Sequence, residues 1–495
     1  MEKKKGNLTF VVSLAIVAVI VIWGLFLPAS FEKAGNVSFK FLVGNFGWLY
    51  SLVMTSFVVF ILWIGFFSKF RNVKLGPDDS KPEYSTISWF AMLFSAGMGI
   101  GLVFWGVAEP MNFFAAPIGA DPGSAEAAKF AINKAFLHWG LQPWANYAVL
   151  ALALAYMQFR QNKPALVSSI FIPILGEQKA RGGFGTFIDI LAIFATIAGV
   201  ATSLGLGALQ INSGLNFLFG IPENDTVLII IVAIVTAAFM TSAVSGLDKG
   251  IKFLSNLNVS IAGLLAISVL MIGPTMQILD ILVEGLGNYI QFLPSNSLSV
   301  GAFANKGWYG GWTTFYWAWW IAWAPFTASF IARISRGRTI KQFCTGVLLA
   351  PTLASFVWFS VFGGIGINAG LEVATEAIKS TSTALFVVLQ QYPMGSLISF
   401  IAIVLLCTFF VTSADSATFV LGMMSTDGNP NPPVSRKVVW GVLQSLLALA
   451  LMLGSSNGLG MLQTMSLVAA FPFIFIMIAA MISLVKALNK EFADK

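Results

Sequence analysis

Long apolar stretches alternate with short polar segments along almost the whole chain. Twelve of the apolar runs have roughly 20 residues, the length that an α-helix needs to cross the hydrocarbon core of a bilayer. These runs cover residues 8–28, 47–67, 87–108, 135–158, 187–207, 226–243, 253–273, 312–332, 343–366, 397–424, 438–453 and 462–485. The pattern predicts an all-α integral membrane protein with twelve transmembrane helices.

Composition excludes a soluble globular protein. Of the 495 residues, 57% are hydrophobic and 10% are charged, and the mean hydropathy is +0.83, whereas about 25% of residues in soluble domains are charged. The first apolar run follows the basic start MEKKK. It is longer than the roughly 7–15-residue core of a signal peptide, so we expect it to be retained as the first helix.

The basic residues predict the orientation. If both termini are cytoplasmic, 22 of the 28 lysines and arginines fall on the cytoplasmic side, as expected for a plasma-membrane protein. The exceptions are Lys33, Lys40, Lys129, Lys134, Lys306 and Lys379. The net charge of +7 then reflects topology and attraction to anionic membrane lipid, and it does not indicate nucleic-acid binding.

An aromatic run in the eighth predicted span suggests a ligand. Tryptophans occur there at positions 308, 312, 317, 319, 320 and 323. Trp308 and Trp312 are typical of an interfacial belt, but Tyr316, Trp320 and Trp323 recur at helical spacing and share one face. Stacked rings inside the membrane suit a quaternary ammonium group, which binds by cation–π attraction. Pro325 follows at once and should interrupt the helix beside such a pocket.

Alternating glycines mark the third predicted span. Gly97, Gly99 and Gly101 lie in the run SAGMGIG. Such a pattern has two explanations of similar weight: close packing of helices, or a broken helix whose freed backbone groups face a substrate and an ion. A phosphate-binding loop is excluded because no Lys-Ser or Lys-Thr follows.

The fourth and fifth predicted spans hold further candidates. Trp144 and Tyr147 lie one turn apart, after His138, the only histidine of the chain. A lone histidine is more often a structural residue with satisfied hydrogen bonds than a proton carrier, and we favour the structural role. In the fifth span, Thr202 and Ser203 are either oxygen donors to a ligand or bonded back to their own helix.

A polar stripe of Gln277, Asp280, Glu284 and Asn288 predicts an amphipathic helix on the outer interface. It separates two groups of five spans, each expected to open with an interrupted helix, and such a pair is typical of an inverted repeat with a site between its halves. The predicted segments are 1–86 with two peripheral spans, 87–273 and 308–485 as the two repeats, 274–307 as the connector, and 486–495 as a short cytoplasmic tail.

An oxygen-bearing cluster lies inside the tenth predicted span. Thr412, Ser413 and Asp415 occur there within one turn. Hydroxyl and carbonyl oxygens suit a hard cation such as sodium, and no Cys/His constellation for a transition metal is present in the sequence. For Asp415, a hydrogen bond or ion pair within the helix bundle is a slightly better explanation than ligation.

Two stretches, FYWAWW at 315–320 and ARISRGR at 332–338, resemble the betaine/choline/carnitine transporter family, and the resemblance covers nearly the whole chain. It implies twelve spans, a five-plus-five inverted repeat, alternating access and a homotrimer. It also implies a substrate site with an aromatic box beside the glycine run, formed by Trp139, Trp144, Tyr147 and Trp320, with Trp319 and Trp323 nearby and Gly97, Gly99 and Gly101 alongside.

The resemblance further implies two sodium sites. The first would consist of Ser95, Met98, Phe409, Thr412 and Ser413. The second would consist of Thr196 and Phe326. The family's pattern has another threonine four residues after the first, and this chain has Val200 there, which leaves the number of coupled sodium ions open.

We therefore expect a secondary transporter that imports glycine betaine as an osmoprotectant by sodium symport. An acidic residue at the end of the glycine run goes with choline in this family, and Gly101 stands there instead. The alternatives are a sodium-independent exchanger of carnitine or betaine, and a choline importer. An enzyme is not expected, because one histidine, few carboxylates within the spans and no soluble domain leave little catalytic machinery. No cofactor is expected besides sodium as coupling ion.

Overall fold

The computed structural model describes residues 2–97, 99–245 and 248–493, without the side chains of 2–5, 94–97 and 248–252. The described part is helical and contains no strand; a single isolated bridge joins Lys74 to Thr339. The helices are α1 (Glu2–Phe26), α2 (Pro28–Leu62), η1 (Trp63–Phe67), α3 (Thr86–Gly97), α4 (Ile100–Ala115), α5 (Ala125–Trp139), α6 (Leu141–Ala155), η2 (Tyr156–Arg160), η3 (Val167–Phe171), α7 (Ile172–Leu175), α8 (Glu177–Ala180), α9 (Gly183–Phe219), α10 (Asp225–Ser245), α11 (Asp248–Ile272), α12 (Thr275–Ser297), α13 (Lys306–Tyr309), η4 (Gly310–Thr314), α14 (Phe315–Ile334), α15 (Ile340–Ala369), α16 (Leu371–Ala377), α17 (Ala384–Leu389), α18 (Gly395–Met424), α19 (Val434–Leu453) and α20 (Gly458–Ala493).

Within the described residues, nine helices are long and apolar enough to cross a membrane. The third, fourth and eighth predicted spans are not among them. The third and fourth spans are each divided into two shorter helices. The eighth, α14, contains four tryptophans and one tyrosine, whose polar ring atoms lower the mean hydropathy. The twelve-span count and the inverted repeat therefore stay predictions.

Both divided spans break at a glycine. The third span ends α3 at Gly97 and resumes as α4 after Gly99, so the break predicted at the glycine run is confirmed, while the role of its freed backbone groups towards a substrate and an ion stays a prediction. The fourth span breaks at Gly140, where a Cβ would press on the carbonyl oxygen of Phe136. Pro143 lies nearby in the first turn of α6, where proline is tolerated, so it does not account for the break.

The expected interruption of the eighth span is wrong. α14 continues from Phe315 to Ile334 with Pro325 inside it. A proline removes one backbone hydrogen bond, and here the helix, against which α6, α9 and α20 pack, continues through that point. The chain therefore breaks at glycines in α3/α4 and α5/α6, and it does not break at the aromatic run.

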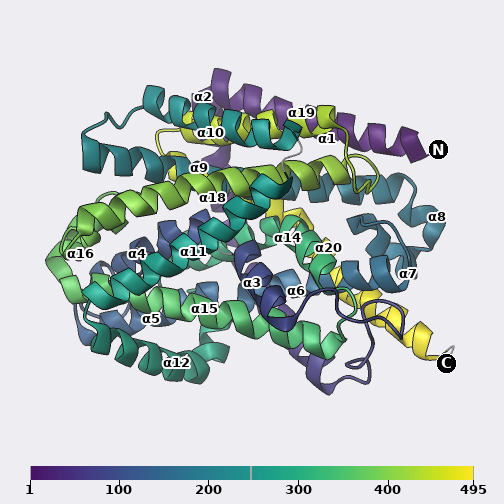
Figure 1. The fold of residues 1–495 in the computed structure, drawn as a ribbon, viewed down its shortest axis with the longest axis horizontal. Coiled ribbons are helices and arrows are strands. Elements are labelled where there is room, and N and C mark those ends of the chain that lie inside the picture. The colour runs from purple at the N-terminus through teal and green to yellow at the C-terminus, as the bar shows by residue number, and fades with distance from the viewer. Residues whose placement is uncertain (1, 98, 246–247, 494–495) are drawn as a thin grey trace.

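α14 forms the centre of the bundle. It packs against α6, α9 and α20, while α4 packs against α5 and α15 and α18 packs against α9. In Figure 1, α1, α10 and α19 lie along one edge and α12 lies along the opposite edge. α1 and α10 each bury only 33% of their most apolar stretch, and α11 buries 22%. The connector contains a helix, α12, as predicted, and its place on the outer interface stays a prediction; α20 continues to Ala493, through most of the predicted tail.

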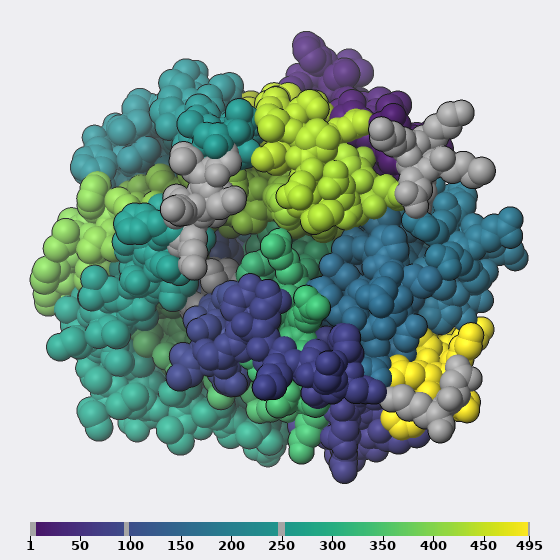
Figure 2. Space-filling view, turned by 45° about the vertical axis from the view of Figure 1, so that its right-hand side comes forward, coloured from purple at the N-terminus to yellow at the C-terminus, as the bar shows by residue number. Residues whose placement is uncertain are grey.

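The segment between η1 and α3 ties together helices that are far apart in sequence. Its backbone pairs with the start of α15, because the Leu75 N–H donates to the Arg338 carbonyl at 2.8 Å and the Ile340 N–H donates to the Val73 carbonyl at 2.9 Å. On the face shown in Figure 2, this dark-blue segment lies near the yellow C-terminal end of α20.

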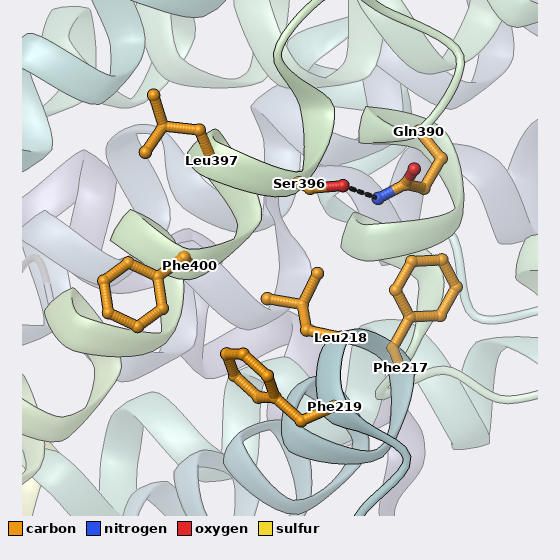
Figure 3. A pocket seen from close by; sticks show the side chains of 7 residues that line it. All are labelled: Phe217, Leu218, Phe219, Gln390, Ser396, Leu397 and Phe400. Atoms are coloured by element: carbon orange, nitrogen blue, oxygen red, sulfur yellow. Dashed lines mark hydrogen bonds between the residues drawn. The ribbon is translucent and has the colours of Figure 1, made fainter.

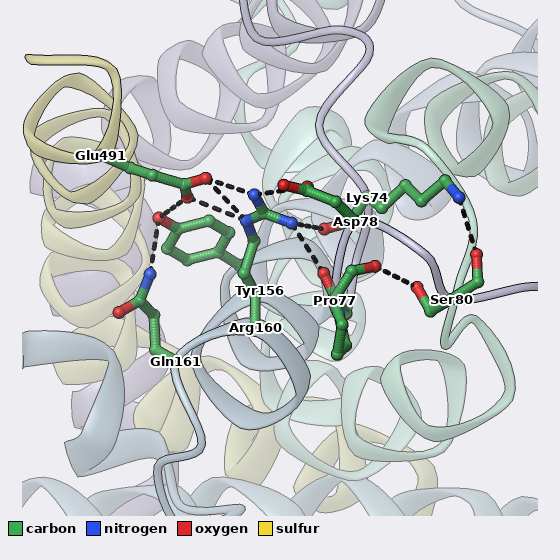
Figure 4. Close-up of polar contacts among 9 residues, drawn as sticks. Lys74, Pro77, Asp78, Ser80, Tyr156, Arg160, Gln161 and Glu491 are labelled. Atoms are coloured by element: carbon green, nitrogen blue, oxygen red, sulfur yellow. Dashed lines mark hydrogen bonds and ion pairs between the residues drawn. The ribbon is translucent and has the colours of Figure 1, made fainter. Parts of the chain in front are cut away.

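Arg160 connects the same segment to the last helix (Figure 4). Its guanidinium donates to both carboxylate oxygens of Glu491 in α20, to the Gly76 carbonyl at 2.7 Å and to Asp78 at 2.8 Å. The Tyr156 hydroxyl donates to Glu491 as well, at 2.8 Å. The Arg160 and Glu491 side chains are only 9% and 14% exposed, so this ion pair lies largely out of water.

Replacing Arg160 with alanine should destabilise the protein by about 3 kcal/mol, since the Glu491 carboxylate would stay buried without its cation. The expected result is a clearly lower melting temperature of the purified protein in detergent. Arg181→Ala is the matched control, because Arg181 is 40% exposed and lies 3.9 Å from the exposed Glu177, where an ion pair contributes little. Equal melting temperatures for the two variants would contradict a structural role for Arg160.

Candidate functional site

A narrow cavity lies at the glycine break between α3 and α4. In this structure it is nearly closed, with a free volume of about 10 Å³, so a ligand must displace the surrounding side chains to enter. Its walls come from α4, α5, α9, α14 and α18, and its lining residues are Gly99, Ile100, Gly101, Leu102, Trp139, Ser203, Trp319, Trp320, Trp323 and Ser413. Six of the nine predicted substrate residues thus line one cavity, and Ser413, predicted as a sodium ligand, lines it too.

The predicted aromatic box forms a chain of edge-to-face contacts. The rings of Trp139 and Trp320 are 4.9 Å apart, Tyr147 lies 6.4 Å from Trp320, and Trp144 lies 5.6 Å from Tyr147. Of these four residues, only Trp139 and Trp320 line the cavity. Trp144 and Tyr147 are buried outside its lining, with Tyr147 in contact with Trp320 and Trp144 in contact with Tyr147.

Glycine at position 101 allows the indoles to approach the backbone. A Cβ on Gly101 would lie 2.5 Å from Cη2 of Trp319 and 3.2 Å from Cη2 of Trp139. On the other side of the break, a Cβ on Gly99 would lie 3.7 Å from the Ser413 hydroxyl oxygen. The glycine run therefore joins an aromatic wall on α5 and α14 to a hydroxyl on α18. Gly97 belongs to the same run, but its surroundings lie outside the described residues.

Buried polar groups at the cavity lack partners. The indole N–H groups of Trp319 and Trp323 have no hydrogen-bond acceptor among the described residues, and neither has the Tyr147 hydroxyl a partner there. Buried polar groups are nearly always hydrogen-bonded in folded proteins, and exceptions need an explanation. Because Trp319 and Trp323 line the cavity, a ligand with acceptor oxygens would supply what they lack.

A buried carboxylate that the sequence interpretation missed lies beside the cavity. Glu109 of α4 has no exposed surface. Its Oε1 lies 2.6 Å from Nδ1 of His138, and its Oε2 accepts from the Trp139 indole at 2.9 Å and from the Tyr316 hydroxyl at 2.5 Å. The signal in the sequence was one acidic residue, followed by Pro110, at the end of an apolar run.

His138 is fully partnered, as we predicted for a structural histidine. Its Nε2 lies 2.9 Å from the Thr313 hydroxyl, and its ring stacks on Tyr316 with centroids 4.6 Å apart. The His138 carbonyl accepts the indole N–H of Trp320 at 2.9 Å. The back-bonded alternative holds for Thr202, whose hydroxyl donates to the Ala198 carbonyl at 2.9 Å.

The first predicted sodium site is described only in part, because Met98 and the side chain of Ser95 lie outside the described residues. On α18, Phe409 is buried and Ser413 faces the cavity. Thr412 points elsewhere, since its hydroxyl accepts from the Asn258 amide of α11 at 3.0 Å. The hydroxyls of Thr412 and Ser413 thus serve different neighbours.

The residues of the second predicted sodium site lie on α9 and α14, two helices that pack against each other. The Thr196 hydroxyl lies 4.0 Å from the sulfur of Met424, and Phe326 packs on Trp323 with ring centroids 5.6 Å apart. The side chain of Val200 is buried and has no oxygen atom that could bind sodium. Among the described residues, no hydrogen bond or ring contact joins Thr196 to Phe326.

A larger hollow occurs between the end of α9 and the start of α18 (Figure 3). It has about 1040 Å³ of empty space, partly open to the surroundings, and is lined by Phe217, Leu218, Phe219, Gln390, Ser396, Leu397 and Phe400. Its two polar residues bind each other, since the Gln390 amide donates to the Ser396 hydroxyl at 3.1 Å. It has no charged residue and no unpartnered N–H donor, so it suits a polar ligand less well than the glycine-break cavity.

Comparison with known proteins decides the class. The profile of the betaine/carnitine/choline family of transporters matches residues 8–493. This chain belongs to that family. It is therefore a multi-pass membrane transporter and not an enzyme, as we predicted.

Similar proteins match over nearly their whole length. A glycine betaine transporter, OpuD, of Bacillus subtilis is 47% identical to this transporter over 97% of this chain and 94% of that protein. A probable glycine betaine transporter of Desulfitobacterium hafniense is 42% identical over 99% and 98%. An ectoine/hydroxyectoine transporter of Virgibacillus pantothenticus is also 42% identical, over 98% and 97%.

Gly101→Ala should lower the stability of this transporter by about 1–3 kcal/mol, the usual cost of overpacking, because the new methyl group forces the Trp319 indole to move. Its melting temperature should fall and its tryptophan emission should change. Gly263→Ala is the control, since a Cβ on Gly263 meets nothing within 4 Å, and it should be neutral or stabilising in its helix. A Gly101→Ala protein as stable as Gly263→Ala would contradict the packing.

Proposed function

We propose that this transporter imports glycine betaine by sodium symport with alternating access. It would work in the plasma membrane with both termini in the cytoplasm, as a homotrimer. The observation that carries the proposal is the cavity at the glycine break, where indole rings, unpartnered N–H donors and a serine hydroxyl converge. The names of its two glycine betaine relatives support the same substrate.

The cavity offers a partner to each end of a betaine. A trimethylammonium group has no N–H to donate, so it binds to ring faces by attraction worth about 0.5–2 kcal/mol each. Trp139 and Trp320 provide such faces at van der Waals distance from each other. The carboxylate of the ligand would accept hydrogen bonds from the indole N–H groups of Trp319 and Trp323. Without such an acceptor, these groups would stay unsatisfied out of water.

This two-ended match favours betaine over choline. Choline has a cation and no carboxylate, so it would leave the indole donors of Trp319 and Trp323 without an acceptor. Gly101 adds no compensating charge. Ectoine, named for a relative, has a carboxylate but no quaternary ammonium, so the ring faces should bind it less strongly than betaine.

Sodium coupling is proposed from the oxygen atoms near the break. Ser413 lies next to Gly99, and Phe409 and Thr412 lie on the same helix. A sodium ion that leaves water needs several protein oxygens, because a partly ligated ion in an apolar bundle is heavily penalised. An ion held between the α3/α4 break and α18 would join the two helices that flank the substrate cavity, and so would couple its own binding to that of betaine.

Uptake into proteoliposomes tests the proposal. The purified protein should accumulate radiolabelled glycine betaine when an inward sodium gradient is imposed and not with an equal potassium gradient. Unlabelled betaine should compete better than carnitine, ectoine or choline. Accumulation without sodium, driven only by preloaded carnitine or betaine, would contradict symport and would favour the exchanger.

Two substitutions distinguish a tryptophan that lines the cavity from one that does not. Trp320→Leu should weaken betaine binding by about 1–2 kcal/mol, the range of a desolvated cation–π contact. Trp144→Leu should weaken it less, because Trp144 lies behind Tyr147. Binding is measured by calorimetry on detergent-purified proteins of equal melting temperature. If Trp144→Leu costs as much as Trp320→Leu, the ligand lies deeper than this cavity.

The two candidate sodium sites make different predictions. The double change Thr412→Ala with Ser413→Ala should abolish sodium-stimulated uptake, because the site near the break loses the Ser413 hydroxyl and the Thr412 hydroxyl, which contacts Asn258 in this structure, can no longer turn to replace it. Thr196→Ala should only raise the sodium concentration needed for half-maximal uptake. Uptake against sodium concentration also gives a Hill coefficient. A coefficient clearly above 1 that falls to 1 in Thr196→Ala would reveal a second working site despite Val200.

A further inference from the structure

We propose that Glu109 is a positioning residue for substrate selection: its carboxylate sets the two indoles, Trp139 and Trp320, that would hold the ammonium group. The inference rests on the proposed function and adds to it a residue that does not line the cavity. Glu109 acts through its hydrogen-bond donors, which come from two other helices.

One carboxylate reaches both rings. Its Oε2 accepts the Trp139 indole N–H at 2.9 Å. Its Oε1 contacts His138 at 2.6 Å, and the backbone carbonyl of His138 accepts the Trp320 indole N–H at 2.9 Å. Trp139 is therefore oriented directly, and Trp320 is oriented through the neighbouring residue of α5.

Hydrogen bonds also connect the Glu109 carboxylate and His138 to the segment at the start of the central helix, α14. The Tyr316 hydroxyl donates to Oε2 at 2.5 Å, and the Thr313 hydroxyl lies 2.9 Å from Nε2 of His138. Glu109, His138 and Tyr316 have no exposed surface. Water cannot replace a missing partner there, so the four side chains and Trp139 hold one arrangement of α4, α5 and the start of α14.

The chemistry favours a carboxylate. An ionised carboxylate only accepts hydrogen bonds and can do so at both oxygens, whereas an amide of the same shape donates at one of them. Trp139 and Tyr316 both donate to Oε2, so an amide must place its oxygen there and its NH₂ towards Nδ1 of His138, which can accept only if the imidazole proton moves to Nε2, beside the Thr313 hydroxyl. Donation to an anion also polarises the Trp139 indole towards a more negative ring, and a more negative face attracts a cation more strongly.

Equilibrium binding of glycine betaine to the purified full-length protein tests the role. Glu109→Gln should raise the Kd at least 10-fold, and Glu109→Asp, which restores the carboxylate, should bind more tightly than Glu109→Gln. Asp189→Asn is the control: Asp189 is another buried carboxylate, which accepts from the Ser168 N–H at 3.0 Å and from the Ser168 hydroxyl at 2.8 Å on η3, away from the cavity. Its Kd should equal that of the wild type.

A double-mutant cycle separates positioning from general stability. Tyr316→Phe should raise the Kd a few-fold, because one anchor of the carboxylate is lost. In a Trp139→Phe background, which has no indole N–H for Glu109 to hold, both Tyr316→Phe and Glu109→Gln should have clearly smaller effects. This cycle decides the matter even if Glu109→Gln fails to fold, since Tyr316→Phe leaves the charge paired with His138.

The outcomes distinguish a failure of the positioning role of Glu109 from a failure of the proposed transport function. A wild-type Kd in folded Glu109→Gln, or equal effects of Tyr316→Phe with and without the Trp139 indole, would overturn the positioning role and leave the proposed function intact. A wild-type protein that binds no glycine betaine would instead overturn the proposed function.

Discussion

The cavity depends on how a negative charge is accommodated in an apolar interior. An ionised carboxylate out of water must be surrounded by donors, or its burial costs several kcal/mol. Glu109 meets this requirement with His138, Trp139 and Tyr316, which come from α5 and α14. The same contacts that satisfy the charge also fix the angle between the helices that carry the aromatic wall. A requirement of electrostatics thus determines the geometry of the rings.

Close packing provides the other half of the arrangement. The indoles of Trp139 and Trp319 can approach the start of α4 only if the facing backbone carries no side chain, and Gly101 meets that condition. Gly140 ends α5 directly after Trp139, so that ring lies at the helix end, next to the break. Broken helices leave backbone groups free for ligands. Here both breaks are adjacent to residues that line the cavity, so both helix ends contribute to the proposed site.

Sequence periodicity predicted most of the helices, because runs of apolar residues have few other stable forms in a membrane. The alternating glycines indicated the break in the third span, and the family resemblance, not periodicity, implied the meeting of Trp139 with Trp320. Periodicity did not predict a role for Glu109, because the partners of this single carboxylate lie 29, 30 and 207 residues away in the sequence. The effect of Pro325 was misjudged, since α14, against which α6, α9 and α20 pack, continues through it. Gly140 was missed because an isolated glycine in an apolar run is more typical of helix packing.

The most direct test of the central claim is a cryo-electron microscopy map of the transporter with glycine betaine and sodium. The account predicts ligand density in the cavity at the glycine break, with the trimethylammonium group against the faces of Trp139 and Trp320 and the Glu109 carboxylate still bound to the Trp139 indole. Density for the ligand at another place, such as the hollow beside Phe217 and Phe400, or a Glu109 side chain turned away from Trp139, would contradict it.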